Sequence, residues 1–323
     1  MQIPIAARVQ PDVSTELRHC DECAIAYAAE LIRAGQTVAV PTETVYGLAA
    51  DARNSDAVAR IYAAKGRPSF NPLIVHVADV PMAAKLAEMN DMAERLAKAF
   101  WPGPLTLVLP VRAEAGLSPL VMAGLPTVAI RCAAHPAMRA LIEASGAPLA
   151  APSANRSGAI SPTRAEHVLR SLGGRIPLVL DGGQTARGIE STIASPAADH
   201  IRLLRPGPIT TEMLARASGL PVVVSGSDHG IEAPGQMESH YAPSKPVRLN
   251  VLSAEREEYL IGFGAVSGDI SLSEAGDLDE AAAALFAALH IADASSAERI
   301  AVAPIPMEGV GLAINDRLRR AAA

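Results

Sequence analysis

Cysteine and aromatic residues are scarce in this chain of 323 residues. Its three cysteines, Cys20, Cys23 and Cys132, are too few for a disulfide framework and are typical of a reducing compartment. Two residues separate Cys20 from Cys23, but no second Cys or His pair completes a zinc ligand set. We therefore expect no metal site built from protein ligands. Aromatic residues make up 3% of the chain, which leaves the core to Ala, Val, Ile and Leu.

Long apolar runs and an excess of positive charge are also missing. No window reaches the ~18 uncharged apolar residues that suggest a membrane-spanning helix, so we expect no membrane partner. The formal net charge is −6, whereas a protein whose main task is to bind nucleic acid is more often basic. These features predict a cytoplasmic protein without a stable nucleic-acid partner, in which any site for a polyanion is a local pocket.

The motifs of several common enzyme sites are absent as well. The sequence has no phosphate loop of the form G-x-x-x-x-G-K-[ST], no G-x-S-x-G nucleophile elbow and no H-E-x-x-H zinc motif. An enzyme that uses ATP must therefore hold the phosphates in another way. Cations on separate loops, such as Lys65, Arg67 and Arg205, are a workable substitute if the sheet gathers them into one cavity.

Half of the residues are hydrophobic and 19% are charged, so the chain can bury a large core. A length of 323 residues exceeds the usual size of one domain, which predicts two. Strand and helix patterns alternate irregularly, and adjacent strand-like runs require antiparallel pairs. We therefore predict the α/β class with some α+β character. A twisted mixed sheet with packed helices would be followed by a second, smaller α/β domain.

The predicted first domain covers residues 1–224, the linker residues 225–246 and the second domain residues 247–323. In the first domain, periodicity and capping residues predict helices over 21–34, 55–65, 81–89, 91–100, 136–145, 164–172 and 210–218. Apolar runs predict strands over 37–40, 73–77, 105–109, 127–131, 148–151, 178–180, 191–195, 201–204 and 221–224. The second domain has predicted strands over 247–252, 259–263 and 299–303 and helices over 279–293 and 308–319. Asp21, Ser55 and Thr163 are the predicted N-caps of three of these helices.

Two polar segments follow predicted elements of the first domain. Residues 41–48, with the sequence PTETVYGL, bring hydroxyls and a carboxylate to the C-terminal end of the strand 37–40, where open α/β sheets bind ligands. Residues 64–73, with the sequence AKGRPSFNPL, carry two cations two positions apart. On an extended segment such side chains point the same way, so Lys65 and Arg67 could hold one polyanion. A turn followed by a solvated basic loop is the alternative.

Two polar residues lie within apolar strands. His76 is the polar member of the strand 73–77, where a buried and fully hydrogen-bonded histidine is the commoner outcome. Arg131 ends the strand 127–131, a place that suits an arginine fork for a carboxylate, although an ordinary surface charge also fits the pattern.

Together, these segments resemble the signature of the YrdC-like family, specifically its threonylcarbamoyl-AMP synthases. Later segments match in the same order: WPGPLT (101–106), APSANRSG (151–158), GIEST (188–192), LRPG (204–207) and HYAP (240–243). Ordered matches across most of the chain are far more specific than any single one. The HYAP segment indicates the two-domain form, because single-domain relatives lack this linker.

The resemblance implies a nucleotidyltransferase that converts L-threonine, bicarbonate and ATP into threonylcarbamoyl-AMP and pyrophosphate, with Mg²⁺ accompanying ATP. The product would feed a downstream threonylcarbamoyl transferase that modifies tRNA. A carbamate formed on the threonine amine would attack the α-phosphorus, so the enzyme needs no nucleophile of its own. Positioning of the substrates, which can supply ~7–11 kcal/mol, and charge stabilisation would then account for catalysis.

Carried over position by position, the resemblance assigns two sets of binding residues. Threonine would be held by Thr44, His76, Arg131, Ser191 and Ala151, with Arg131 on the carboxylate. ATP would be held by Lys65, Arg67, Asn71, Ser153, Asn155, Arg205 and the linker residue Tyr241, with Thr127 and Ser161 as further members. Lys65 and Arg67 are the candidate catalytic residues, because they would stabilise charge on the phosphates.

Three other functions fit parts of the sequence. An RNA-binding module would use a concave basic surface, but the acidic net charge and the few aromatic residues available for base stacking argue against it. A YrdC-like paralogue with other carbamoyl or phosphate chemistry would lack the HYAP linker. An inactive partner protein would not need both Lys65 and Arg67. The second domain carries no sharp motif, and we expect it to cover the cavity of the first domain through the linker.

Overall fold

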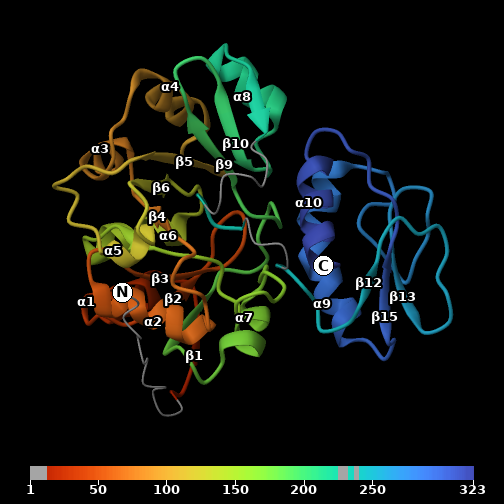
Figure 1. The fold of residues 1–323 in the computed structure, drawn as a ribbon. Helices are drawn as coiled ribbons and strands as arrows, with labels where there is room; N and C mark the ends of the chain where they lie inside the picture. The colour runs from red at the N-terminus through yellow and green to blue at the C-terminus, as the bar shows by residue number, and fades with distance from the viewer. Residues whose placement is uncertain (1–12, 225–231, 236–239) are drawn as a thin grey trace.

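The computed structural model describes residues 13–224, 232–235 and 240–323. The predicted linker therefore lies partly outside the described residues, at 225–231 and 236–239. Within the described residues the chain forms two sheets with packed helices, in a larger N-terminal and a smaller C-terminal part (Figure 1). No helix of these ranges is both long enough and apolar enough to cross a membrane.

The large sheet contains strands of both directions. Its strands are β1 (Glu16–His19), β2 (Val38–Val40), β3 (Gly47–Asp51), β4 (Ile74–His76), β5 (Leu105–Pro110), β6 (Thr127–Arg131), β7 (Leu149–Ala150), β8 (Leu178–Asp181), β9 (Thr192–Pro196), β10 (Ile201–Arg205) and β11 (Val222–Val224). They lie in the order β1-β8-β2-β3-β7-β4-β6-β5-β9-β10-β11. The pair β4–β6 is parallel, whereas β2–β3 and β5–β6 are antiparallel. This arrangement confirms the predicted mixed sheet.

Helices pack on this sheet and bury most of its apolar side chains. They are α1 (Glu22–Arg33), α2 (Ser55–Lys65), α3 (Val80–Leu86), α4 (Asp91–Phe100), α5 (Pro119–Met122), α6 (Pro136–Ser145), α7 (Ala165–Leu172) and α8 (Thr211–Ser218). As predicted, Asp21 caps α1 by accepting a hydrogen bond from the amide of Ala24 (2.8 Å). Gly35, at φ +74°, ends the same helix.

Three local expectations were wrong. Asn54, rather than Ser55, caps α2, because its side chain accepts from the amides of Asp56 and Ala57. Thr163 is not a cap, since α7 begins after Arg164 and has no side-chain cap. Residues 65–67 are not extended either: Lys65 ends α2 and Gly66 is in the left-handed region at φ +60°. The two cations therefore leave the backbone from a helix end and a loop.

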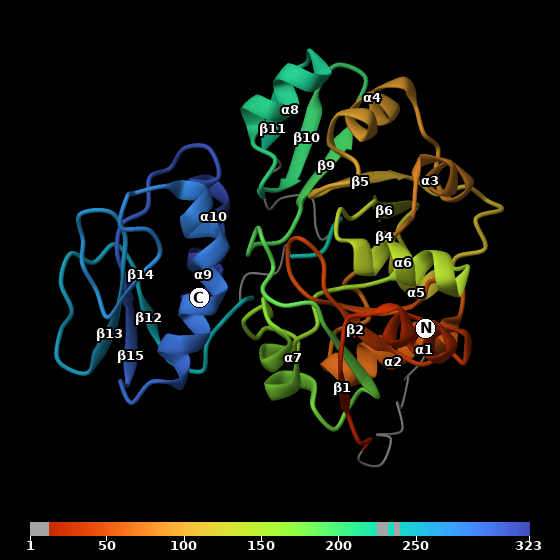
Figure 2. The ribbon, with the colours of Figure 1, turned by 180° about the vertical axis from the view of Figure 1, so that it is seen from behind.

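The smaller sheet is parallel and carries helices on the side that faces the large part. It consists of β12 (Val247–Arg248), β13 (Glu258–Gly262), β14 (Ile270–Ser271) and β15 (Arg299–Val302), in the order β12-β15-β13-β14. The helices α9 (Leu278–Ala294) and α10 (Gly311–Ala321) lie between this sheet and the larger part, in both the front and the rear view (Figures 1 and 2). One buried cluster joins Val45, Ile189 and Tyr241 to Leu285 and Phe286 of α9. The two parts therefore share apolar core.

Candidate active site

A pocket lies where several loops of the large sheet meet the described linker residues. Nine of the fourteen predicted site residues line it: Thr44, Arg67, His76, Arg131, Ala151, Ser153, Ser191, Arg205 and Tyr241. The sheet explains why they meet. The strands β4 and β6 are parallel, and their last residues, His76 and Arg131, are partners in register. Carboxyl ends of parallel strands share one edge of a sheet, which is the edge where ligands bind in such folds.

Arg131 is the centre of one half of the pocket. Its side chain is 4% exposed, and its Nη2 lies 2.7 Å from Oε1 of Glu43 in an ion pair. Its Nη1 donates to Oγ1 of Thr44 (2.9 Å) and its Nε donates to the carbonyl of Gly103 (3.2 Å). Burial raises the pKa of Glu43, but Arg131 outweighs it and the pKa stays below its usual value. Glu43 therefore remains an anion that orients the Arg131 guanidinium.

His76 lies beside Arg131 and is 2% exposed. Burial, with a smaller effect of Arg131, lowers the pKa of His76 to about 3, so the imidazole is neutral at pH 7. Its Nδ1 has no hydrogen-bond partner among the described residues. A buried polar atom without a partner is costly, so this nitrogen is suited to a polar ligand in the pocket.

Two buried cations lie at the second half of the pocket: Arg67 lines it, and Lys65 lies outside the lining, against Ser153. Lys65 Nζ donates to the carbonyls of Ser153 (2.6 Å) and Asn155. Arg67 Nη2 donates to Oδ1 of Asn71 (2.6 Å) and to the carbonyl of Pro72. Burial lowers the pKa of Lys65 well below its usual value and that of Arg67 to about 10. Among the described residues, no carboxylate forms a hydrogen bond or ion pair with either cation, and an anionic ligand would offset the cost of burying them.

Arg205 links the two halves. It ends β10 and is 5% exposed. Its Nη2 donates to the carbonyl (2.9 Å) and to Oγ (3.2 Å) of Ser191, and its Nη1 donates to the carbonyl of Pro234 (3.4 Å). Ser191 Oγ in turn lies 2.7 Å from Oγ1 of Thr106. Arg205, which is predicted to bind ATP, thus holds Ser191, which is predicted to bind threonine.

The described linker residues lie against these side chains. Tyr241 is 1% exposed, adopts φ +65° and has no partner for its hydroxyl among the described residues. A Cβ on Gly235 would lie 2.7 Å from that hydroxyl, so only glycine permits this approach. The amide of Ala242 donates to the carbonyl of Gly158 (2.7 Å). The linker is thereby tied to the large part at the pocket.

The other five predicted residues lie outside the lining: Lys65, Asn71, Asn155, Ser161 and Thr127. Asn155 is buried and its Nδ2 donates to the carbonyls of Arg156 and Ala159. Ser161 is buried and donates from Oγ to Oε1 of Glu190. Thr127 is the first residue of β6, at the end of the strand away from Arg131, and is not brought to the pocket. Its role in binding stays a prediction.

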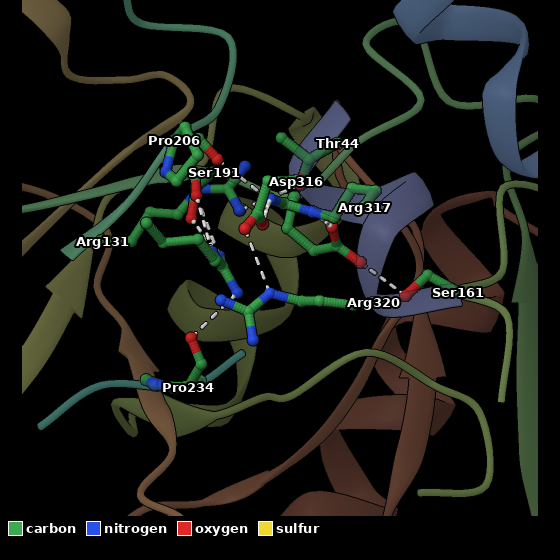
Figure 3. Close-up of polar contacts among 11 residues, drawn as sticks. Thr44, Arg131, Ser161, Ser191, Pro206, Pro234, Asp316, Arg317 and Arg320 are labelled. Atoms are coloured by element: carbon green, nitrogen blue, oxygen red, sulfur yellow. Dashed lines mark hydrogen bonds and ion pairs between the residues drawn. The ribbon is translucent and has the colours of Figure 1, made fainter. Parts of the chain in front are cut away.

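Three charged residues of the site were not predicted: Glu43, Glu190 and Arg317. The two glutamates lie within the sequence motifs 41–48 and 188–192, so these motifs could have indicated them. Arg317, on α10, had no such signal, although its Nε lies 2.8 Å from Oε2 of Glu190 (Figure 3).

Protein ligands for a metal ion are not gathered here. Among the described residues, no group of three or more His, Cys, Asp and Glu side chains could hold one. Glu190, the only carboxylate among the described lining residues, is already ion-paired. Mg²⁺ prefers phosphate oxygens and water with few protein ligands, so these residues fit an ion that arrives on a nucleotide.

Comparison with known proteins covers nearly the whole chain. The family model Sua5_yciO_yrdC, described as "Telomere recombination", matches residues 30–207. The model Sua5_C, described as "Threonylcarbamoyl-AMP synthase, C-terminal domain", matches residues 209–323. The threonylcarbamoyl-AMP synthase of Bacillus subtilis is 46% identical, with 96% of each chain covered. That of Pyrococcus abyssi is 41% identical, over 93% of this chain and 94% of its own.

A solved structure shows the same arrangement. The crystal structure of P. abyssi Sua5 complexed with L-threonine superimposes with a TM-score of 0.86 at 38% identity, covering 96% of this chain and 97% of the other. These matches confirm the resemblance drawn from the sequence segments. The chain belongs to the Sua5/YrdC-like family of threonylcarbamoyl-AMP synthases, in its two-domain form.

Proposed function

We propose that the protein is an L-threonylcarbamoyladenylate synthase, which converts L-threonine, bicarbonate and ATP into threonylcarbamoyl-AMP and pyrophosphate. The observation that carries the proposal is one pocket in which buried Arg131 and buried Arg67 and Arg205 meet. The first arginine suits an amino-acid carboxylate and the other two suit a polyphosphate. The relatives named above carry this activity in their names, and P. abyssi Sua5 was crystallised with L-threonine.

In the proposed reaction, the protein positions its substrates and they react with one another. Arg131 would pair with the threonine carboxylate, a charge-assisted contact worth ~1.5–3 kcal/mol. The hydroxyls of Thr44 and Ser191 and the neutral imidazole of His76 would bind the remaining polar atoms. The threonine amine would condense with bicarbonate to form a carbamate, with loss of water. A carbamate oxygen would then attack the α-phosphorus of ATP while pyrophosphate leaves.

Charge stabilisation would come from the buried cations. Lys65 and Arg67 would hold the phosphates as negative charge moves to the leaving pyrophosphate, and preorganised donors of this kind are a large part of many rate enhancements. Mg²⁺ bound to the phosphates would neutralise further charge there. No side chain is required to form a covalent intermediate.

The pocket must open to admit a nucleotide. Its free space is about 40 Å³, whereas sites for ligands of drug size measure ~300–1,000 Å³. Tyr241 and His240 are among the lining residues, so we infer that these two side chains move away from Arg205 when ATP enters. The product would then pass to a cytoplasmic transferase that modifies tRNA.

Pyrophosphate release from ATP tests the proposal. We expect release that needs ATP, L-threonine and bicarbonate together, with threonylcarbamoyl-AMP as the second product by mass spectrometry. Release that persists unchanged without threonine or without bicarbonate would contradict it. An RNA shift that depends on salt, with no turnover of ATP, would favour the RNA-binding alternative instead.

A further inference from the structure

One arginine of the smaller part is completely buried at the boundary with the active site. Arg317 on α10 is 0% exposed. Its Nε lies 2.8 Å from Oε2 of Glu190, its Nη2 donates to the carbonyl of Pro206 (3.0 Å), and its Nη1 lies 2.7 Å from Oδ2 of Asp316. All three nitrogens of the guanidinium therefore have a partner, and two of these partners belong to the large part (Figure 3).

Both of these partners adjoin predicted substrate-binding residues. Glu190 immediately precedes Ser191, and its Oε1 accepts from Ser161. Pro206 immediately follows Arg205, whose guanidinium donates to Ser191. One guanidinium thus connects the two backbone segments that carry the threonine and nucleotide contacts.

These two segments are packed too closely to move independently. A Cβ on Gly207 would lie 2.4 Å from the amide nitrogen of Thr192 and 2.8 Å from the carbonyl oxygen of Glu190. Arg317 holds both segments from the same side, so a shift of α10 would be transmitted to Ser191 and Arg205 together.

Arg317 also compensates the charge of Glu190. Glu190 lines a pocket whose proposed ligands are anions, and among the described lining residues it is the only carboxylate. Burial lowers the pKa of Arg317, but Tyr241, Glu190 and Asp316 together outweigh it and the pKa lies above its usual value. Arg317 therefore stays charged and compensates Glu190. Without it, a buried and uncompensated carboxylate would face the phosphates.

We propose that Arg317 is a positioning residue of the active site. It neutralises Glu190 and fixes Ser191 and Arg205, so that the smaller domain completes the site instead of only covering it. This inference rests on the proposed function, since it assumes that Ser191 and Arg205 contact threonine and ATP.

The test compares R317M, R317K, E190Q and the double variant R317M/E190Q in the full chain. R317M leaves Glu190 uncompensated, so we expect the KM for ATP to rise by about tenfold or more, within the range of coupling between neighbouring buried groups. E190Q in the R317M background removes the repelling charge and should recover part of that loss. R317K keeps the charge but cannot contact three acceptors at once, so it should lie between R317M and the unchanged protein.

Two further measurements separate this role from a merely structural one. Calorimetric binding of ATP without threonine should weaken in R317M and recover in the double variant, whereas loss of packing alone would make the double variant at least as weak as R317M. R248M breaks the Arg248–Glu258 pair (2.6 Å) within the smaller domain and is the matched control, with an expected unchanged KM.

The outcomes are distinguishable. If the unchanged protein releases pyrophosphate as proposed and folded R317M has an unchanged KM and ATP affinity, the inference about Arg317 is overturned and the function stands. If the unchanged protein shows no threonine-dependent release, the proposed function fails first. Should R317M not fold, as judged by circular dichroism, R317K carries the test: an ATP affinity equal to that of R248M would overturn the role of Arg317.

Discussion

Arg131 illustrates how a single residue is prepared for its ligand. A guanidinium at the end of a strand rotates freely unless its donors are engaged, and here Glu43, Thr44 and Gly103 engage all three nitrogens. The contact with Arg131 lowers the pKa of the Glu43 carboxyl, so Glu43 stays ionised through the neutral range. A planar fork held in this way loses little freedom when a second carboxylate binds.

Replacing Arg131 should therefore weaken threonine binding above all. We expect R131A to raise the KM for threonine by about ten- to a hundredfold, because a charge-assisted contact worth ~1.5–3 kcal/mol is lost. The KM for ATP should change much less. Steady-state pyrophosphate release at varied threonine measures the effect, and R53A, at an exposed pair with Asp51, is the control. An unchanged threonine dependence would exclude Arg131 from this contact.

The buried cations should affect turnover more than binding of threonine. We expect K65A and R67A each to lower kcat, because each should raise the activation free energy by ~2–4 kcal/mol. This is the scale seen when one charge-stabilising donor is removed. Single-turnover pyrophosphate release at saturating substrates measures this barrier. K85A, at an exposed position of α3, should leave it unaltered. Near-normal release from either buried-site variant would refute the assigned role.

At this scale, the sequence predicted which residues line the pocket better than it predicted how they are held. The nine that line it stand in short sequence motifs, and several of these, such as His76, Arg131 and Arg205, are at strand ends, where chain direction decides their location. The partners that orient these residues could not be predicted in the same way. Glu43 in a polar turn looks like any surface carboxylate, and only the burial of Arg131 beside it reveals the ion pair.

Among the elements, strong local signals predicted most helices and strands of the large part, whereas the strands β1 and β3 were missed. The helix α6 has the predicted ends, 136 and 145, because Pro136 and Gly146 mark them. The strand β3, with the sequence GLAAD, is absent from the predicted strands, since it lacks β-branched residues and is buried by pairing with β2 and β7. The strand β1 is exposed along its length and shows no apolar alternation. Both strands depend on partners that are distant in sequence.

The helices α7 and α9 meet through two histidines. The rings of His167 and His290 are stacked with centroids 3.8 Å apart, and Nε2 of His290 lies 3.2 Å from the carbonyl oxygen of Ser161, to which it can donate. Burial lowers the pKa of His167 to about 3 and that of His290 to about 4. Both rings are thus neutral in the folded protein at pH 7, which allows them to stack.

This contact predicts a loss of stability in mild acid. The folded pKa values lie below the unfolded value near 6.5, so the unfolded chain binds more protons between about pH 4 and pH 6.5. Stability is complete above that window and falls as the pH decreases through it. We expect H290Q, which keeps a donor to Ser161, to reduce the fall between pH 7.5 and 5.5 by about 1 kcal/mol.

Thermal unfolding at several pH values measures this fall. The exposed pair of His200 with Asp199 provides the control, and H200Q should leave the stabilising effect of neutral pH intact. A pH dependence of unfolding in H290Q that matches the unchanged protein would show that the stacked pair does not titrate as described.

For the molecule as a whole, the decisive contacts join residues that are far apart in the sequence. Arg317 with Glu190, His290 with Ser161, and α9 against the loop at Gly188 all connect the smaller part to the larger one. Neither residue of such a contact has a sequence signal that indicates its partner. The second domain could be predicted from its strand and helix rhythm, but its docking could not, because docking depends on shape and charge that arise only after both parts fold.

This docking predicts that the two parts unfold together. Gly188 is at φ +68°, and a Cβ there would lie 2.4 Å from the carbonyl oxygen of Ala283 in α9. That atom is backbone and cannot rotate away, so G188A should push α9 from the loop. We expect one calorimetric transition for the unchanged protein and two for G188A, with the earlier one from the smaller part. Because the same shift displaces Arg317, G188A should also weaken ATP binding.

The variant G219A is the control that distinguishes this clash from backbone strain. Gly219 is also at positive φ, +74°, but nothing lies within 4 Å of its added Cβ. G219A should therefore cost only the ~1–2 kcal/mol of a left-handed L-residue and retain a single transition. If G188A and G219A unfold alike, with one transition and equal ATP affinity, the loop at Gly188 does not couple the two parts. A split confined to G188A would show that close backbone contact makes the two domains one cooperative unit.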